Sequence, residues 1–282
     1  MECIIKKQRD EILQRYYELV YPRKLKDNEY IKIHLSKIDA EGKRIEFDRF
    51  VRGFEEYREI IEKYRYNYNI YNELATIRGD PKEGKLNGQE KNLFRRQVLY
   101  LDYDKKDYPK LGEDVYQFTR MIKEKLPDLF IHAVYNSGGG FHFYISVDQT
   151  EKQRKITTLN KRIAELVGAD SNACKVTQIA RVPTTYNCKP QRKTGDGKYP
   201  MMLEIDHYQK HPNQVKKYHP LDIDNLIRKV QKSKEKSTQE EIQELPRQEW
   251  EYGFDGYDVK QYSCLWTEKV FREGAEKGER NA

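Results

Sequence analysis

A glycine-rich turn between two strand-like segments constrains the fold of this chain more than any other feature. Residues 131–147, IHAVYNSGGGFHFYISV, read as a strand, a glycine turn and a second strand, which predicts a β-hairpin. Strand-like and helical segments alternate around this hairpin without a strict β-α-β rhythm. The pattern therefore favours a mixed α/β or α+β domain over a doubly wound parallel sheet.

Periodicity places the other elements of the chain. Helical spacing of apolar residues predicts helices over residues 1–20, 48–66, 114–127, 150–168 and the first part of 221–245. Strands are predicted over residues 30–38, 68–77, 98–104 and 199–209. Gly168 is expected to end the fourth of these helices as its C-cap.

Composition narrows the class of protein. The 282 residues carry a formal charge of +7, from 53 lysines and arginines against 46 acidic residues, and include 22 Tyr and 10 Phe. This balance suits a polyanionic partner without requiring one, and aromatic rings can stack on bases. The four cysteines lie far apart with no C-x-x-C pair, which argues against a zinc site or a disulfide framework and fits a reducing cytoplasm. The N-terminus has no signal-peptide core, and no segment approaches the ~18 apolar residues of a membrane span.

Two aspartates stand at the end of the apolar segment VLYLDYD, residues 98–104. Alternate residues of a strand share a face, so Asp102 and Asp104 are predicted to point the same way, with α-carbons ~6–7 Å apart. Carboxylates this close raise each other's pKa, and a divalent cation such as Mg²⁺ or Mn²⁺ removes the repulsion. The plainer interpretation is a frayed strand end that enters the polar turn DKKDYP, because D-x-D alone occurs by chance in many chains.

The glycine hairpin is a second candidate site. Three glycines after Ser137 allow backbone N–H groups to approach an anion closely. His142 shares a strand face with Tyr144, and a histidine in such a pattern is by itself more often a half-buried structural residue. The segment is not a Walker loop, because no Gly-Lys-Ser/Thr follows it and a strand succeeds it.

A third segment, residues 168–190, contains Asp170 together with Lys175, Arg181 and Lys189. The basic side chains suit the phosphates of a nucleotide or a template. Considered alone, an ordinary surface loop with solvated charges is the simpler interpretation.

In their order along the chain, the three segments resemble the archaeo-eukaryotic primase superfamily, and within it the primase-polymerases of plasmids, phages and other mobile elements. VLYLDYD is similar to the strand of that family that ends in D-x-D or D-x-E, and SGGGFH is similar to its S-G-x-G-x-H form. Asp170, about ten residues before RVPTTYN, is similar to the acid that precedes an R-[VL]-P-G-T-x-N segment. The resemblance covers roughly residues 65–210.

The resemblance implies an RRM-like antiparallel sheet with flanking helices, joined to an N-terminal α/β unit. It implies that Asp102, Asp104 and Asp170 hold two divalent ions, Mg²⁺ or Mn²⁺, and that they act in catalysis with His142. The expected nucleotide-binding residues are Ser137, Gly138, Gly139, His142, Lys175 and Arg181. Of these, Arg181 is expected to hold either phosphate or the fold of its own loop.

Two positions depart from the family pattern. Thr184 stands where the family often has Gly, which affects the local turn. Asp206, in the segment MLEIDHY, is a rival for the third acidic ligand, because other branches place that acid on a late strand. Asp170 is the preferred candidate.

The resemblance also suggests how the chain is divided. Residues 1–235 are expected to form the catalytic domain. Residues 236–282 are expected to form a linker and the truncated start of a C-terminal helical module, because CLWTEKVFREGAEKGERNA resembles the opening of such a module.

The implied activity is that of a DNA-dependent primase-polymerase, a nucleotidyltransferase that uses two metal ions and ribo- or deoxyribonucleoside triphosphates on a single-stranded DNA template. A helicase or another replication protein is a candidate partner, and no membrane is expected. The alternative is a non-catalytic module that binds single-stranded nucleic acid or an origin. A metal-dependent nuclease is a third option, but it has no use for a triphosphate-binding hairpin. The sequence leaves open the sugar preference, the template preference, priming without a primer, the biological context and the oligomeric state.

Overall fold

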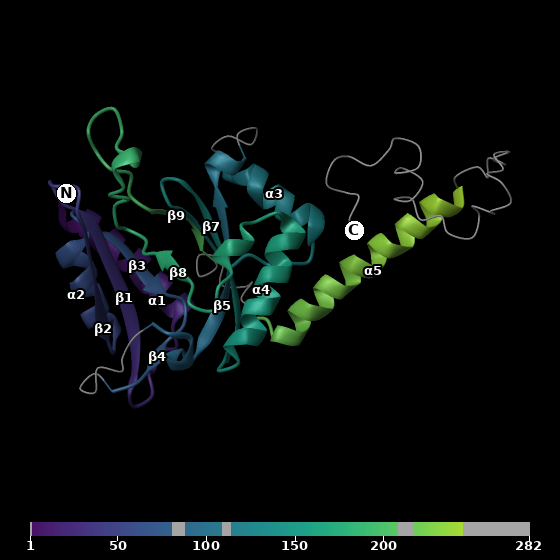
Figure 1. Cartoon of the computed structure of the whole chain (residues 1–282), viewed down its shortest axis with the longest axis horizontal. Helices are drawn as coiled ribbons and strands as arrows, with labels where there is room; N and C mark the ends of the chain where they lie inside the picture. The colour runs from purple at the N-terminus through teal and green to yellow at the C-terminus, as the bar shows by residue number, and fades with distance from the viewer. Residues whose placement is uncertain (1, 81–87, 109–113, 208–216, 245–282) are drawn as a thin grey trace, which may run out of the picture. The chain divides into compact units, whose positions relative to one another are not determined.

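The computed structural model describes residues 2–80, 88–108, 114–207 and 217–244 (Figure 1). The chain divides into two units, residues 1–234 and residues 235–282. The first unit contains both β-sheets and the candidate site. Of the second unit, only the end of α5 (Pro220–Glu244) is described, so the expected C-terminal module lies outside the described residues. Among the described residues, no helix combines the length and the apolar character needed to cross a membrane.

The first sheet is antiparallel and has the strand order β2-β1-β3-β8, with β4 paired to β1. Its strands are β1 (Glu29–Ile38), β2 (Arg44–Val51), β3 (Asn69–Glu73), β4 (Ile77–Arg78) and β8 (Ile179–Arg181). Ile31, Ile33 and Leu35 of β1 are buried, whereas the residues between them are half-buried, so the sheet has one apolar and one polar face. Helix α2 (Phe54–Tyr64) contributes Tyr57 and Ile61 to the same apolar core.

The second sheet is also antiparallel, with the strand order β5-β7-β6-β9. Its strands are β5 (Arg96–Asp104), β6 (Ala133–Asn136), β7 (Gly140–Thr150) and β9 (Leu203–His207). β6 and β7 form the predicted hairpin, which turns through residues 137–139. β5 is an edge strand of this sheet, and it carries the two aspartates of the D-x-D sequence.

Helices cover one face of the second sheet (Figure 1). α3 (Val115–Lys125), α4 (Gln153–Val167) and the first turns of α5 pack their apolar residues against β5 and β7. This core contains Leu99, Leu101, Tyr103, Phe118, Ile122, Phe141, Phe143, Ile156, Leu159, Ile163, Ile223 and Ile227. α4 ends at Gly168, which has a φ of 75°, so the predicted C-cap is confirmed.

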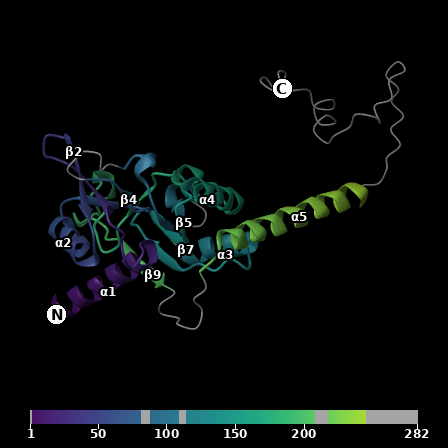
Figure 2. The same ribbon diagram turned by 90° about the horizontal axis from the view of Figure 1, so that it is seen from below.

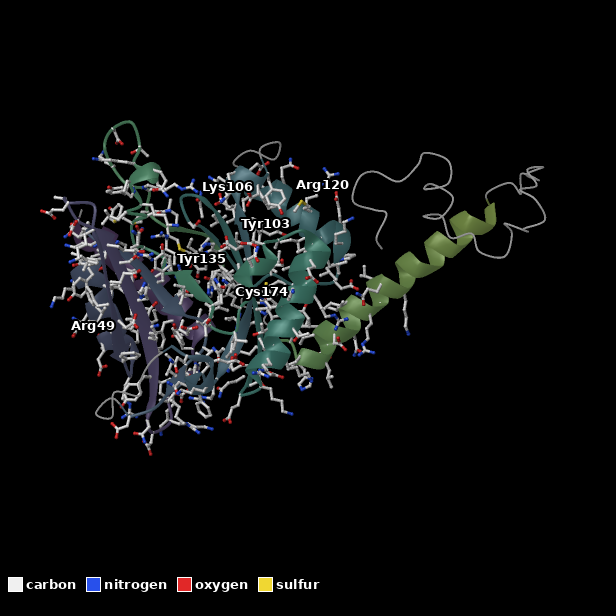
Figure 3. All side chains as sticks on the ribbon, viewed as in Figure 1. Arg49, Tyr103, Lys106, Arg120, Tyr135 and Cys174 are labelled. Atoms are coloured by element: carbon white, nitrogen blue, oxygen red, sulfur yellow. The ribbon has the colours of Figure 1, made fainter. Side chains whose placement is uncertain are left out.

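Helix α1 (Glu2–Val20) joins the two sheets and is seen clearly in Figure 2. The Tyr16 hydroxyl donates a hydrogen bond to Asn72 Oδ1 on β3 at 2.9 Å. The ring of Tyr16 packs edge-on against Tyr135 of β6 and Tyr144 of β7, and Figure 3 labels Tyr135 in this interior. The opposite face of the second sheet therefore faces α1 and the first sheet, not a second helical layer.

Three predicted elements differ from the structure. The helix predicted over residues 48–66 begins only at Phe54, because residues 48–51 belong to β2, where Asp48 hydrogen-bonds His34 of β1 at 2.8 Å. The strand predicted over residues 68–77 is broken into β3 and β4. Helix α5 continues to Glu244, past the point where a linker was expected to begin.

Candidate active site

Strand β5 presents two of the predicted carboxylates on one face of the second sheet. Tyr103 and the leucines before it are buried against the helices, so Asp102 and Asp104 face the other way. The antiparallel register places His142 of β7 opposite Asp102 and Gly140 opposite Asp104. The two carboxylates share a strand face, as the alternation of the sequence predicts.

A short turn after α4 brings a third carboxylate beside these two. Asp170 precedes the 3₁₀ turn η4 (Ser171–Ala173) and caps it, because its side chain accepts a hydrogen bond from the Asn172 N–H at 2.8 Å. The backbone N–H of Asp170 donates to the carbonyl oxygen of Asp102 at 2.9 Å. This bond fastens the turn directly to β5.

The three carboxylates line a single cavity of about 220 Å³. Most of the residues expected at the site also line this cavity: Asp102, Asp104, Ser137, Gly139, His142, Asp170 and Arg181. Three candidates do not line it. Gly138 adopts a φ of 77° and donates its N–H to Asn136 within the turn, and Lys175 is exposed elsewhere on the surface. The third is Asp206.

The position of Asp206 on β9 separates it from the other acids. Asp206 pairs with Val134 of β6, and Val134 is buried in the core beneath the helices. Cross-strand partners share a face, so Asp206 lies on the opposite face of the sheet from Asp102. Of the two candidates for the third acid, the structure brings Asp170 to the cavity.

Asp102 is destabilised in its ionised form. Burial is the main reason why its pKa is raised to about 6. A hydrogen bond from the Tyr100 hydroxyl opposes this shift, while the nearby carboxylates of Asp170 and Asp104 add to it. A bound cation would offset both the desolvation cost of the ionised Asp102 carboxylate and the repulsion between the three carboxylates.

Basic side chains partly neutralise Asp104. Arg192 Nη2 lies 3.5 Å from one carboxylate oxygen, and Lys106 Nζ lies 3.4 Å from the other. Arg192 reaches this position over Gly139, where an added Cβ would meet the guanidinium carbon at 2.8 Å. Arg192 and Lys189 were not among the predicted nucleotide-binding residues, although Lys189 lies in the basic segment 168–190 and Arg192 follows it by two residues. The structure places both in the wall of the cavity.

His142 is a neutral imidazole inside the cavity wall. Its side chain is buried, and burial together with the positive charge of Arg181 lowers its pKa to about 3. Its Nε2 lies 3.7 Å from Asp102 Oδ1. Its Nδ1 is buried without a hydrogen-bond partner among the described residues. A buried polar atom of this kind, in the wall of a cavity, favours the binding of a ligand that completes its hydrogen bonding.

Arg181 brings a buried positive charge to the same cavity. Its guanidinium donates four hydrogen bonds of 2.9–3.1 Å, to the side chains of Asn69, Tyr71 and Asn187 and to the carbonyl of Tyr186. Burial lowers its pKa, and none of the described carboxylates forms an ion pair with it. A guanidinium that is fixed by neutral partners and lacks a counter-ion favours the binding of an anion.

Two of these partners, Tyr71 and Asn187, line the cavity but were not predicted. The alternation of β3 places Tyr71 on the polar face of the first sheet, which is the signal that could have identified it. Asn187 belongs to the RVPTTYN segment, and it also donates to the carbonyl of Ser137 at 3.2 Å. That contact joins the RVPTTYN segment, residues 181–187, to the glycine hairpin.

The acids fit divalent cations in their chemistry, although their side chains do not converge on one point. Within the described part of the chain, no three His, Cys, Asp or Glu side chains form a ready-made cation site. Carboxylate oxygens are the ligands that Mg²⁺ and Mn²⁺ prefer, and all three acids face one cavity. Binding would require Asp104 to exchange its contacts with Arg192 and Lys106 for the ion.

Comparison with solved structures identifies the fold. No protein-family profile matches the sequence, and no curated protein matches it significantly. The structure is similar to the archaeo-eukaryotic primase domain of the cyanophage S-2L primase-polymerase, with a TM-score of 0.53 and 13% identity over 77% of this chain and 97% of that domain. The primase RepB′ is also similar, with a TM-score of 0.48 and 10% identity over 83% of this chain and 66% of that one. The catalytic domain of RepB′ in complex with initiator DNA gives a TM-score of 0.47 and 9% identity over 82% and 97% of the two chains.

This chain therefore has the α+β fold of archaeo-eukaryotic primase-polymerases, which confirms the fold class predicted from its sequence. The expected antiparallel sheet with flanking helices is β5-β7-β6-β9. Most of the first sheet, with α1 and α2, precedes it in the chain, but β8 of the first sheet comes from a later segment.

Asp102→Asn is expected to raise the free energy of unfolding of the metal-free protein by about 2 kcal/mol at about pH 8. The pKa of Asp102 is raised to about 6 in the folded state, so its ionised form destabilises the fold above that pH. As the pH falls toward about 4, the folded wild-type protein takes up the proton first, and the difference between the two proteins shrinks. Urea unfolding in the presence of EDTA at both pH values measures this difference.

Asp148→Asn, at an exposed position of β7, is the matched control. It is expected to change the free energy of unfolding by less than about 0.5 kcal/mol at either pH. An Asp102→Asn protein that is less stable than the wild type at about pH 8 would contradict the destabilisation of ionised Asp102 by desolvation and by its neighbouring carboxylates.

Proposed function

We propose that this protein is the catalytic domain of a DNA-dependent primase-polymerase. It transfers nucleotides from ribo- or deoxyribonucleoside triphosphates to a growing strand on a single-stranded DNA template. One observation carries the proposal: three carboxylates and a buried arginine without an acidic partner among the described residues meet in one cavity of a primase-polymerase fold. Opposite charges in one cavity suit a substrate that is bound through both metal ions and phosphates.

Asp102, Asp104 and Asp170 would hold the divalent ions, and when bound these ions neutralise the triphosphate and activate the attacking 3′-hydroxyl. The part played by the chain itself is to hold the carboxylates in place. The Tyr100 hydroxyl bonds Asp102, and the main chain of Asp170 bonds the carbonyl of Asp102. Both contacts limit the motion of the acids before a substrate arrives.

The phosphate groups would bind to the basic side of the cavity. Arg181 is already ordered by four hydrogen bonds, so binding an anion there costs little conformational entropy. Lys189 and Arg192 line the same cavity and add two further charges. His142, neutral and with Nδ1 unpartnered among the described residues, can donate one N–H to a phosphate oxygen without carrying a charge itself.

Two features of the surface support a single-stranded nucleic acid as the template. The net charge of +7 attracts a polyanion. Tyr66 is 57% exposed, and its ring stacks on Tyr186, which directly precedes the cavity residue Asn187. An exposed ring beside a basic cavity offers an unpaired base a surface on which to stack.

Asp102→Ala is expected to lower nucleotide incorporation at least about 1,000-fold. The substitution removes a proposed ligand of the divalent ions, which would be needed both to bind the triphosphate and to activate the 3′-hydroxyl. The assay uses the purified chain, single-stranded DNA, labelled nucleoside triphosphates and Mg²⁺ or Mn²⁺, with and without a primer. Asp206→Ala is the matched control, since Asp206 lies on the other face of the sheet. It is expected to retain activity within about twofold of the wild type.

The products of the same assay decide between functions. Short products without a primer establish a primase, and extension only from a primer establishes a polymerase. DNA binding without synthesis in either condition would overturn the proposal in favour of a non-catalytic binding module. Metal-dependent loss of the template without synthesis would indicate a nuclease.

Arg192→Ala is expected to raise the KM for the nucleoside triphosphate about tenfold, because one charge-assisted contact to phosphate is lost. Steady-state kinetics at a saturating DNA concentration measure the effect. Lys175→Ala is the control, because Lys175 carries the same charge in the neighbouring segment but does not line the cavity. Equal KM changes in the two variants would show that only the general positive charge matters, and would contradict a phosphate site at Arg192.

A further inference from the structure

The free edge of β5 is closed by a side chain rather than by another strand. β5 stands at the end of the order β5-β7-β6-β9, and Tyr100 pairs with Tyr144 on its inner side. The backbone groups of Tyr100 nevertheless bond outward. Its N–H donates to Asn160 Oδ1 at 2.7 Å, and its carbonyl accepts from Asn160 Nδ2 at 2.9 Å. The amide of Asn160, on α4, thus occupies the place that the peptide group of a neighbouring strand would take.

The same amide also reaches the segment that carries the third carboxylate. Asn160 Nδ2 donates to Cys174 Sγ at 3.0 Å, and the Cys174 thiol donates to the carbonyl of Asp170 at 3.8 Å. The N–H of Asp170 returns to the carbonyl of Asp102, two residues beyond Tyr100 on the same edge of β5. Asn160, Cys174, Asp170 and β5 therefore form a closed ring of hydrogen bonds. Cys174 is labelled in Figure 3.

Burial makes this ring rigid. The Asn160 side chain is fully buried, and Cys174 is 4% exposed. Water has little access to replace these bonds, so their loss would leave the peptide groups of Tyr100 unpaired at the edge of the sheet. The strand would then be free to shift relative to the Asp170 turn, at the point where the two acid-bearing segments must keep a fixed separation to share metal ions.

We propose that Asn160 is a positioning residue that sets the separation between the Asp102 strand and the Asp170 turn, and thereby the affinity of the site for divalent cations. The inference rests on the proposed function, because it assigns the three aspartates as ligands. Asn160 does not line the cavity. It acts through Tyr100 on one side and through Cys174 on the other.

Gln153 separates this role from ordinary structural support. It lies on the same helix, it is buried, and its side-chain amide donates to the carbonyl of Phe94 at 2.8 Å, before β5 begins. Asn160 and Gln153 thus both tie α4 to the β5 segment through a buried amide. Of the two, Asn160 is the one connected to the acids.

The test measures Mn²⁺ binding to the metal-free chain by calorimetry, together with thermal stability, for the wild type, Asn160→Ala, Cys174→Ala and Gln153→Ala. Asn160→Ala is expected to weaken Mn²⁺ binding at least about tenfold. Cys174→Ala, which removes only the link to Asp170, is expected to weaken it about threefold. Gln153→Ala is expected to lower the melting temperature while leaving the Mn²⁺ dissociation constant unchanged.

Two results would overturn the inference. One is a wild-type Mn²⁺ affinity in Asn160→Ala with a loss of stability like that of Gln153→Ala. If Asn160→Ala does not fold, Cys174→Ala decides, and an unchanged dissociation constant in that variant would overturn the inference. Asp102→Asn separates this failure from failure of the proposed function: if the wild type binds no Mn²⁺ that Asp102→Asn removes, the proposed metal site itself is overturned.

Discussion

The antiparallel pairing of β5 with β7 is the constraint on which the rest of the site depends. One face of β5 is fixed by apolar packing against α3 and α4, so its other face must carry Asp102 and Asp104 toward the cavity. The register then sets His142 against Asp102 and the glycine turn against Asp104. A slip of one residue would bury both carboxylates among the leucines, which the cost of burying unpaired charge forbids. The core of the domain therefore determines the geometry of the site.

The charges in the cavity are balanced in an unusual way. Asp102 is half-buried and repelled by its neighbours, and its pKa is raised to about 6, whereas Arg181 is buried and held by neutral groups. His142 adds no charge, because burial keeps it neutral. The guanidinium of Arg192 lies beside Gly139 and close to Asp104, where it partly neutralises the Asp104 carboxylate. Such a cavity is stabilised by a ligand that brings positive charge to the acids and negative charge to the arginines, and a metal–nucleotide complex has this composition.

Much of this arrangement could be predicted from the sequence, because it depends on local patterns. The hairpin, the C-cap at Gly168 and the shared face of Asp102 and Asp104 follow from periods of two and 3.6 residues and from one glycine. The nearness of Asp170 to Asp102 could not follow from periodicity, since it depends on a main-chain bond between segments that lie far apart in sequence. The resemblance of the ordered motifs supplied that expectation instead. The position of Lys175 could not be predicted from charge alone. Lys175 was expected to bind the nucleotide because it is basic and close to Asp170 in sequence, but it does not line the cavity. Strand β2 shows another limit: its last residues, 48–51, run directly into the helical pattern of α2, and only pairing with β1 assigns them to a strand.

The central claim is that the three aspartates and the basic cavity wall bind a metal–nucleotide complex. The most direct measurement is a crystal structure of the chain with Mn²⁺, single-stranded DNA and a non-hydrolysable nucleoside triphosphate, in which anomalous scattering locates the manganese. Manganese is expected to be bound by Asp102, Asp104 and Asp170. The triphosphate is expected to lie against Arg181 and Arg192, with Arg192 released from Asp104. Manganese at Asp206, or a triphosphate bound away from Arg181, would contradict this claim.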